Sequence, residues 1–275
     1  AVIVLALCLV SGRQGQSLAG PVLIGVLGSK NEIGGLTHLL ICSGLALAVD
    51  GSQPRWLRLL VLPVSATALF VLLTGFSSGA VLATLLFCGV FAILMAAART
   101  PPAIRVLLIL CLVAFAIPLW MLRADLMDMW EGFVVNVLHK DVGLTGRDYL
   151  WSYADRLIAE RPLLGHGFRS TWQGDGAETI GLLRWAGLTS GAGFSFHDNY
   201  REWLVDFGYA GGGVIALVML IGLVRTVLRA MSPISTPSWL FLASIGIVFA
   251  ARAKVENLFG PFNSSTVIIV AVAAY

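Results

Sequence analysis

The side chain best suited to acid–base chemistry in this chain is His197, in the stretch FSFHDNYREWLVDFG. It comes directly before a long apolar run, and a neutral imidazole at a membrane–water boundary can act as a general base near neutral pH. Asp198 follows it, although adjacent side chains need not face each other. A histidine that only forms hydrogen bonds in an interfacial belt with Tyr200 and Trp203 is the alternative that this stretch leaves open.

Arginines suggest a second kind of chemistry, the binding of phosphate. Arg147, in GLTGRDYLWSYADRLIAERPLLGHGF, lies near the start of an expected membrane-proximal helix. A guanidinium and the first amides of a helix can bind one phosphate together. Pairing with Asp148, or anchoring at lipid headgroups, is the structural alternative. Arg156, Arg161 and Arg169 add positive charge nearby, and each alone is typical of a solvated or ion-paired residue.

Lys30 and Asn31, in LGSKNEIGG, form a third polar group between two apolar runs. Polar side chains near membrane depth are costly and therefore often functional, but an interfacial anchor explains them nearly as well. His166 lies between two glycines, which predicts a turn, and we interpret His38 and His139 as structural.

Several patterns of cofactor and metal sites are missing from the sequence. It contains no Walker A motif, no GxGxxG, no HExxH and no DxD pair, so it gives no support for nucleotide-driven or metal-dependent chemistry. The four cysteines lie inside apolar runs without a CxxC pair, which favours helix packing over metal or disulfide chemistry. We therefore expect neither a metal nor a cofactor.

The elements that must position these residues are membrane helices. Of 275 residues, 58% are hydrophobic and 12% are charged, and the mean hydropathy is +0.88. Soluble domains average about 45–50% apolar and about 25% charged residues. This composition excludes a soluble enzyme, a disordered tail and a nucleic-acid binder. Because every backbone amide must be satisfied inside a bilayer, we predict an all-α, polytopic helical bundle with a large extracytoplasmic loop region that carries short helices.

Apolar runs of the right length predict membrane spans at about 33–49, 57–73, 79–98, 104–122 and 203–224. Shorter runs follow at about 238–251 and 263–275. The run 18–27 has only ten residues and contains Pro21, so it suits a re-entrant or interfacial piece. The run 1–11 looks truncated, and the chain begins without Met and ends inside an apolar run, so we expect it to belong to a longer protein.

Charge placement predicts the topology. The loops 50–58, 99–105 and 225–237 carry six arginines and one acid, which makes them cytoplasmic under the positive-inside rule. The turn 74–78 and the segment 123–202 must then face the other side. We therefore divide the chain into N-terminal membrane helices (1–122), an extracytoplasmic region (123–202) and C-terminal membrane helices (203–275).

The segment 123–202 concentrates the polar chemistry, with eleven of the fifteen acids and eight of the eighteen Lys and Arg residues. An amphipathic pattern predicts a helix over about 147–160, ended by Pro162 and Gly165. A second short helix is expected over 177–186, followed by a small-residue hinge over 187–193. A connection of this length is too long to be a mere linker, so we expect the function to lie there.

Two motifs together resemble a known family. The run GRDYLWSYADRLIAERPLLGHGF, followed by HDNYREWLVDFGYAGGG, resembles the O-antigen ligase and polysaccharide polymerase superfamily, nearest to the bacterial exopolysaccharide polymerases. Three further stretches resemble flanking elements of the same family: LGSKNEIGG, TGFSSGA and ENLFGPFN. The resemblance therefore covers about 28–275.

The resemblance implies a metal-independent, inverting glycosyltransferase of the bacterial inner (cytoplasmic) membrane, with its site facing the periplasm. The implied donor is a glycan on undecaprenyl diphosphate, and the implied acceptor is a second glycan or the lipid A core; membrane lipids surround the protein, and no nucleic acid is involved. The position of His197 matches the family's base, and that of Arg147 matches the group that holds the donor diphosphate. The residues expected to bind substrate are Arg147, Lys30, Arg169, Asp198 and Tyr200.

Two departures from the family pattern affect this expectation. The turn 77–80 reads Ser-Ser-Gly-Ala, so the family's arginine is missing at Ser78, and its role must pass to Lys30, Arg123, Arg169 or no residue. The family's His-Asn pair reads His197-Asp198-Asn199 here, which leaves open what orients the imidazole. A polytopic transporter of a lipid-linked or small anionic substrate, and a non-catalytic scaffold, are the alternative functions.

Overall fold

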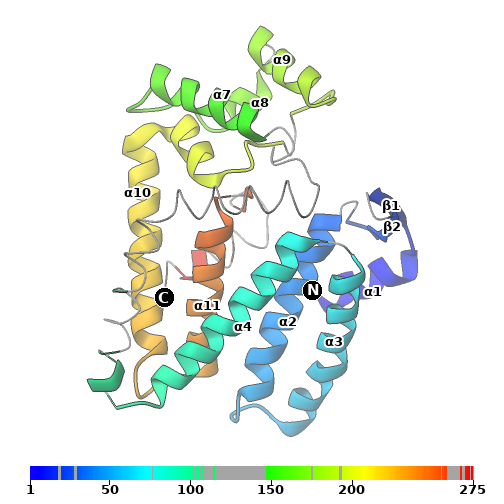
Figure 1. The fold of residues 1–275 in the computed structure, drawn as a ribbon, viewed down its shortest axis with the longest axis vertical. Coiled ribbons are helices and arrows are strands. Elements are labelled where there is room, and N and C mark those ends of the chain that lie inside the picture. The colour runs from blue at the N-terminus through cyan, green and yellow to red at the C-terminus, as the bar shows by residue number, and fades with distance from the viewer. Residues whose placement is uncertain are drawn as a thin grey trace. The chain divides into compact units, whose positions relative to one another are not determined.

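The fold is seen in a computed structural model of residues 1–275 (Figure 1). The structure describes residues 1–101 apart from 18–19, 28–29 and 76; residues 103–105, 107 and 114; residues 147–258 apart from 175, 192–193 and 255; and residues 267, 270–272 and 274. Most of the predicted span 104–122, the first part of the segment 123–202 and most of the final apolar run therefore lie outside the described residues. The three expected domain boundaries stay predictions.

The described part of the chain is mostly helical, as the composition predicts. Its elements are α1 (Val2–Ser11), β1 (Gln14–Ser17), β2 (Gly20–Leu23), α2 (Lys30–Val49), α3 (Arg55–Thr74), α4 (Ser78–Ala98), α7 (Arg147–Glu160), α8 (Ser170–Gln173), α9 (Ala177–Trp185), α10 (Asn199–Ala230) and α11 (Pro237–Arg252). Among them, α2, α3, α4 and α10 are long and apolar enough to cross a membrane, so the chain is a polytopic membrane protein.

These four helices confirm four predicted spans, and α1 and α11 confirm two of the shorter runs. The run 18–27 gives a different result, because part of it forms β2, which pairs antiparallel with β1. Pro21 is tolerated there because each strand of a two-stranded ribbon is an edge strand.

The chain forms two units, which we describe separately. The first unit comprises Ala1–Thr100, Gly222–Phe249 and Ala274–Tyr275, and the second comprises Pro101–Ile221 and Ala250–Ala273.

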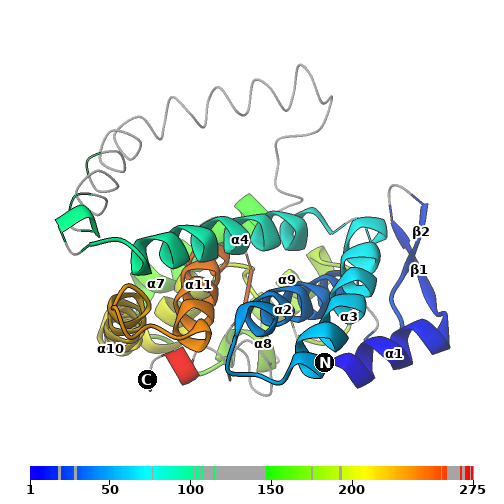
Figure 2. The same ribbon diagram turned by 90° about the horizontal axis from the view of Figure 1, so that it is seen from below.

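In the first unit, α2 packs against both α3 and α4, with the helices side by side (Figures 1 and 2). Small residues allow close approach: a methyl group at Gly34 would meet the Ser77 hydroxyl, and one at Gly44 would meet the Ser65 hydroxyl. The end of α2 and the start of α11 line a common cavity, so the loops beside them lie at one end of the unit. This agrees with the predicted placement of the loops 50–58 and 225–237 on one membrane side; the membrane side itself, and the placement of the loop 99–105, stay predictions.

The second unit is organised around α7, whose bounds match the predicted helix. Its buried side chains form one stripe and pack with residues of α8, α9 and α10 and of the segment before α10; this core comprises Leu150, Ala154, Leu157, Ile158, Trp172, Leu182, Phe196 and Val205. α9 confirms the second predicted short helix. An amphipathic helix of 14 residues is stable here because its apolar stripe is covered.

A kink in α10 fixes the chain that leaves α7. At Gly208 the backbone departs from helical geometry, with φ 63° and ψ −171°, and the bend is visible in Figure 1. The loop after α7 replaces interrupted helical bonds: the Tyr209 amide donates to the Pro162 carbonyl over 2.7 Å, and the His166 amide donates to the Val205 carbonyl over 2.7 Å. Gly208 thus adopts a backbone conformation that only glycine adopts readily.

Replacing Gly208 by alanine tests this kink. A methyl group there would meet the Leu163 backbone, and the backbone angles are unfavourable for alanine, so we expect Gly208→Ala to lower the free energy of unfolding by about 2–3 kcal/mol. Gly213→Ala, in the same helix with nothing within 4 Å of the added methyl group, is the control and should cause no loss. Denaturant titration in detergent measures both; equal stability of the two variants would contradict this account.

Candidate functional site

The backbone at His197 adopts a left-handed conformation, with φ 53°. Such a conformation is uncommon for residues other than glycine and persists only where surrounding contacts hold it. Here the His197 amide donates to the Ser195 hydroxyl over 3.2 Å, and the preceding Phe196 amide donates to Glu202 over 2.9 Å. The Trp172 indole N–H donates to the second oxygen of Glu202 over 2.7 Å, so the turn that carries the imidazole is fixed on both sides.

The His197 imidazole is partly buried and packs edge-on against Phe194, with 5.8 Å between ring centroids. Burial lowers the pKa of His197 below its usual value of 6.5, the positive charge of Arg147 lowers it further, and the carboxylate of Glu256 acts in the opposite direction. The imidazole is therefore neutral at neutral pH, which is the form that can accept a proton.

Arg147 is the first residue of α7, and its guanidinium lies 3.9 Å from a carboxylate oxygen of Glu256. Both side chains are less than one-third exposed, at 21% and 29%. The fold thus brings an arginine, a glutamate and a histidine within electrostatic reach of one another from positions up to 109 residues apart. The sequence suggests Arg147 and His197 individually; Glu256 carries only a weak signal, its place in a short polar stretch after α11.

Asp198 directly precedes α10 and is fully buried. One of its carboxylate oxygens accepts hydrogen bonds from the amides of Tyr200 and Arg201, at 3.0 and 3.2 Å, which is the geometry of a helix N-cap. Its other oxygen accepts from the Arg201 guanidinium over 2.7 Å and from the Lys254 ammonium over 3.1 Å. These contacts give Asp198 a structural role, and its expected part in substrate binding stays a prediction.

Three further hydrogen bonds connect the start of α10 to the segment 250–258. The Asn199 amide donates to the Ala253 carbonyl over 2.7 Å, and the Leu258 amide donates to the Asn199 side-chain oxygen over 2.7 Å. The Tyr200 hydroxyl donates to the Ala250 carbonyl over 2.8 Å. The segment that carries Glu256 is therefore held against the segment that carries His197.

A second set of contacts connects α7 to α10. Arg201 binds Asp155 through two hydrogen bonds of 2.8 and 3.0 Å, and its guanidinium lies 5.1 Å from the Trp151 ring centroid. The Trp151 indole N–H donates to the Phe196 carbonyl over 3.1 Å. Arg147, Trp151 and Asp155 follow at intervals of four, so they form one stripe on α7. This stripe faces the residues around His197. The spacing of four residues from Arg147 and Trp151 is the sequence signal that could have predicted Asp155 as part of the site.

Arg169 supports the same turn. Its guanidinium donates to the carbonyls of Gly191 and Phe194, at 3.2 and 3.0 Å, and so orders the chain just before His197. Lys30 and Ser78 belong to the first unit, where they begin α2 and α4, and Arg123 lies outside the described residues. Which residue takes the role of the family's missing arginine therefore stays open.

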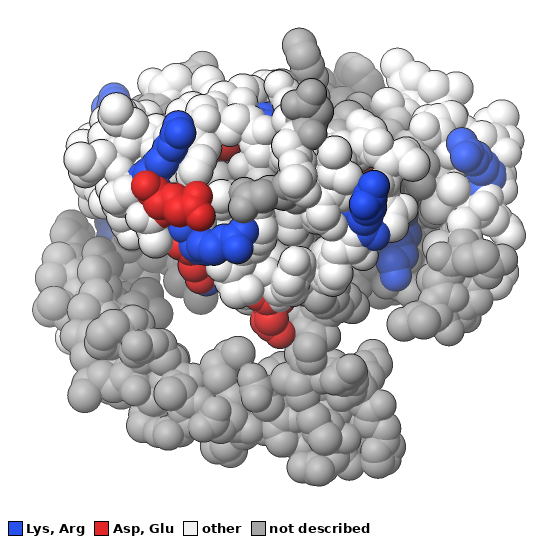
Figure 3. All heavy atoms as spheres, turned by 90° about the horizontal axis from the view of Figure 1, so that it is seen from above, with Lys and Arg blue, Asp and Glu red and all other residues white. Residues whose placement is uncertain are grey.

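On one face of the described chain, acidic side chains lie beside basic ones, while other basic side chains stand apart among uncharged atoms (Figure 3). Within the described residues, no group of three or more His, Cys, Asp and Glu side chains could hold a metal ion.

Comparison with known proteins identifies the family. The family profile described as O-antigen ligase matches residues 63–216, more than half of the chain and including both Arg147 and His197. The chain belongs to the O-antigen ligase family. It is also 28% identical over 244 residues to the exopolysaccharide production protein ExoQ of Rhizobium meliloti (strain 1021), covering 87% of this chain and 55% of that relative. The chain thus spans about half the length of the curated relative that it matches.

The surroundings of His197 predict how its pKa responds to substitution. In the wild type, NMR titration of labelled histidine should give a pKa for His197 below 6.5. Arg147→Gln should raise that pKa because it removes a repelling positive charge, and Glu256→Gln should lower it because it removes an attracting negative charge. A wild-type pKa above 6.5, or shifts of the opposite sign, would contradict the described geometry.

Proposed function

We propose that this chain carries the catalytic region of a membrane glycosyltransferase that transfers or polymerises glycan from undecaprenyl diphosphate. The observation that carries the proposal is the neutral, partly buried His197 within electrostatic reach of Arg147, in a chain of the O-antigen ligase family. The name of the curated relative, an exopolysaccharide production protein, supports a polysaccharide product.

In the proposed reaction, an acceptor hydroxyl attacks the anomeric carbon of the donor sugar. A new carbon–oxygen bond forms to the acceptor, the bond between the anomeric carbon and the diphosphate breaks, and undecaprenyl diphosphate leaves with the electron pair. His197 takes the hydroxyl proton as general base. Attack opposite the leaving group inverts the configuration of the anomeric carbon.

Arg147 is the proposed partner of the departing diphosphate. A guanidinium can bind phosphate oxygens through two parallel hydrogen bonds and stabilises the negative charge as it develops. In the free protein the Glu256 carboxylate lies 3.9 Å from this guanidinium. The long separation makes this a weak ion pair that a diphosphate can replace.

The geometry of α10 supports a site on one membrane face. Beyond the kink, the helix runs from Tyr209 to Ala230, which at 1.5 Å per residue is roughly 33 Å, enough to cross the hydrocarbon core. His197 precedes one end of α10, and Arg225 and Arg229 lie in its last turns at the other end. With these arginines on the cytoplasmic side, we place His197 on the periplasmic side of the inner membrane.

Transfer in vitro tests the proposal. The full-length protein in nanodiscs is given a defined lipid-linked oligosaccharide, with or without a lipid A core acceptor, in the presence of a chelator and without nucleotide. A ladder of products indicates a polymerase, and a single block on lipid A indicates a ligase. If no glycan is transferred, and proteoliposomes instead move the lipid-linked substrate across the bilayer, the proposal is wrong and transport is favoured.

Arg147→Ala should affect the donor more than the acceptor. Because the lost guanidinium binds the diphosphate, we expect the KM for the lipid-linked donor to rise by roughly tenfold or more, with a smaller change for the acceptor. Arg161→Ala, which removes an exposed arginine after the same helix, is the matched control and should leave both values unchanged. The reverse pattern, a rise only for the acceptor, would refute the assigned role.

The pH dependence of transfer follows from the lowered pKa of His197. The neutral imidazole is the active form, so kcat/KM should fall at low pH as the ring is protonated, with the acid limb centred below pH 6.5. Arg147→Gln should move this acid limb to higher pH, since the pKa of His197 then rises. An acid limb centred above pH 6.5 in the wild type would contradict the assignment of His197 as base.

A further inference from the structure

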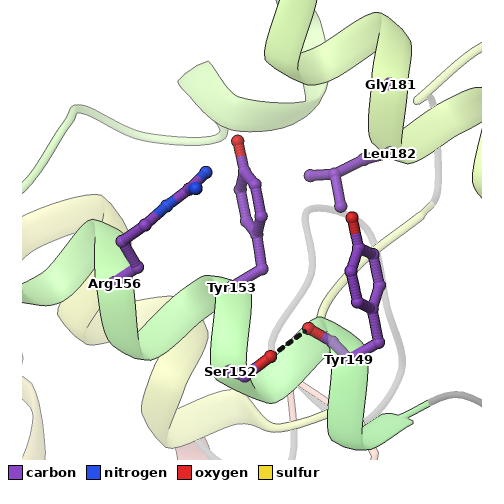
Figure 4. A pocket seen from close by; sticks show the side chains of 6 residues that line it. All are labelled: Tyr149, Ser152, Tyr153, Arg156, Gly181 and Leu182. Carbon is purple, nitrogen blue, oxygen red and sulfur yellow. Dashed lines mark hydrogen bonds between the residues drawn. The ribbon is translucent and has the colours of Figure 1, made fainter.

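A hollow lies on the face of α7 that the His197 cluster does not use. Tyr149, Ser152, Tyr153 and Arg156 follow one another at helical spacing and form a stripe of their own. Together with Gly181 and Leu182 of α9 they line a cavity of about 400 Å³ (Figure 4). This volume is within the range of sites for small molecules, roughly 300–1,000 Å³.

The walls of this hollow combine flat aromatic surfaces with hydrogen-bonding groups. Tyr149 is 48% exposed, and its ring packs 4.8 Å from the ring of Trp185, which lies outside the lining of the hollow. The guanidinium of Arg156 lies 4.4 Å from the ring centroid of Tyr153. Hydroxyl groups, a planar guanidinium and exposed rings beside the buried Leu182 match a ligand with both an apolar face and many hydroxyls.

Contacts of α7 fix the shape of the hollow. The buried stripe of α7 fixes the helix against the core of the second unit. The Ser152 hydroxyl donates to the Tyr149 carbonyl over 2.9 Å, which leaves its oxygen able to accept a hydrogen bond (Figure 4). Arg156 lies 3.8 Å from Glu160, a weak exposed ion pair that a ligand can replace. The site is therefore formed before any ligand binds.

We propose that this hollow binds sugar residues of the glycan substrate, at a distance from the reacting bond. A pyranose ring presents an apolar C–H face that can stack on Tyr149, and hydroxyls that Arg156 and Ser152 can bind. α7 with its side chains is about 10–12 Å across, so a glycan held here reaches the opposite stripe, where Arg147 lies, within a few sugar units. This inference rests on the proposed function, because it assumes that the substrate is a glycan.

A direct binding measurement tests this inference independently of the proposed function, because binding of a glycan can be measured without any glycan transfer. The probe is the free oligosaccharide released from the lipid donor, of one, two and three repeat units, titrated by NMR or calorimetry into full-length protein in nanodiscs. Tyr149→Ala should weaken binding of the three-unit probe by roughly tenfold, and Tyr149→Phe, which keeps the ring, should stay within about threefold of the wild type. Arg156→Gln should also weaken it.

The matched control is Phe168→Ala, which removes another exposed, stacked aromatic ring of the second unit without touching the hollow. It should bind the three-unit probe as the wild type does. If Tyr149→Ala binds the probe as tightly as the wild type, or no more weakly than Phe168→Ala, the glycan site is refuted even where transfer is active. If the probe binds in a Tyr149-dependent manner while no transfer occurs, the glycan site stands and the proposed reaction fails.

Discussion

A carboxylate without exposed surface is stable only where donors replace the water that it has lost. Asp198 meets that condition with two backbone amides of its own helix and two cationic side chains, Arg201 and Lys254. The amides fix where α10 starts, Arg201 extends the network to α7 through Asp155, and Lys254 connects it to the segment after α11. Because three segments meet at this one group, the position of His197 depends on it.

The same network explains how a membrane protein with few charges can hold a strained turn. The left-handed backbone at His197 costs about 1–3 kcal/mol, which the surrounding hydrogen bonds offset. The kink at Gly208 adds a second constraint by binding the loop after α7 to α10. α7 is held from both ends, and its three stripes can therefore serve three purposes: one is buried in the core, one faces the His197 cluster and one lines the hollow that we assign to glycan.

Much of this fold could be predicted from the sequence, and the reasons are physical. Apolar runs of about 20 residues have few alternatives to membrane helices, so α2, α3 and α4 follow from composition, and the spacing of apolar residues gives the bounds of α7. The ribbon of β1 and β2 could not be predicted because strands of four residues containing glycine and proline carry no clear periodicity.

The site was only partly predictable for a different reason. Arg147 and His197 lie in motifs, whereas Glu256 and Lys254 acquire their roles from partners more than 50 residues away, and no local pattern encodes such pairs. Asp198 is expected from the sequence to bind substrate, and its role as the cap and ion-pair centre of α10 could not be predicted because it depends on Arg201 and Lys254. The left-handed conformation of His197 also has no clear sequence signal, because glycine is the usual residue at such positions.

The central claim is that His197 removes the proton from the acceptor while Arg147 holds the donor. Single-turnover transfer in nanodiscs tests it most directly, with His197→Gln and the wild type compared at equal occupancy of lipid-linked donor. The account predicts that donor binding stays within about twofold while the transfer rate falls at least 100-fold, the usual contribution of a general base. Transfer by His197→Gln at close to the wild-type rate would contradict it.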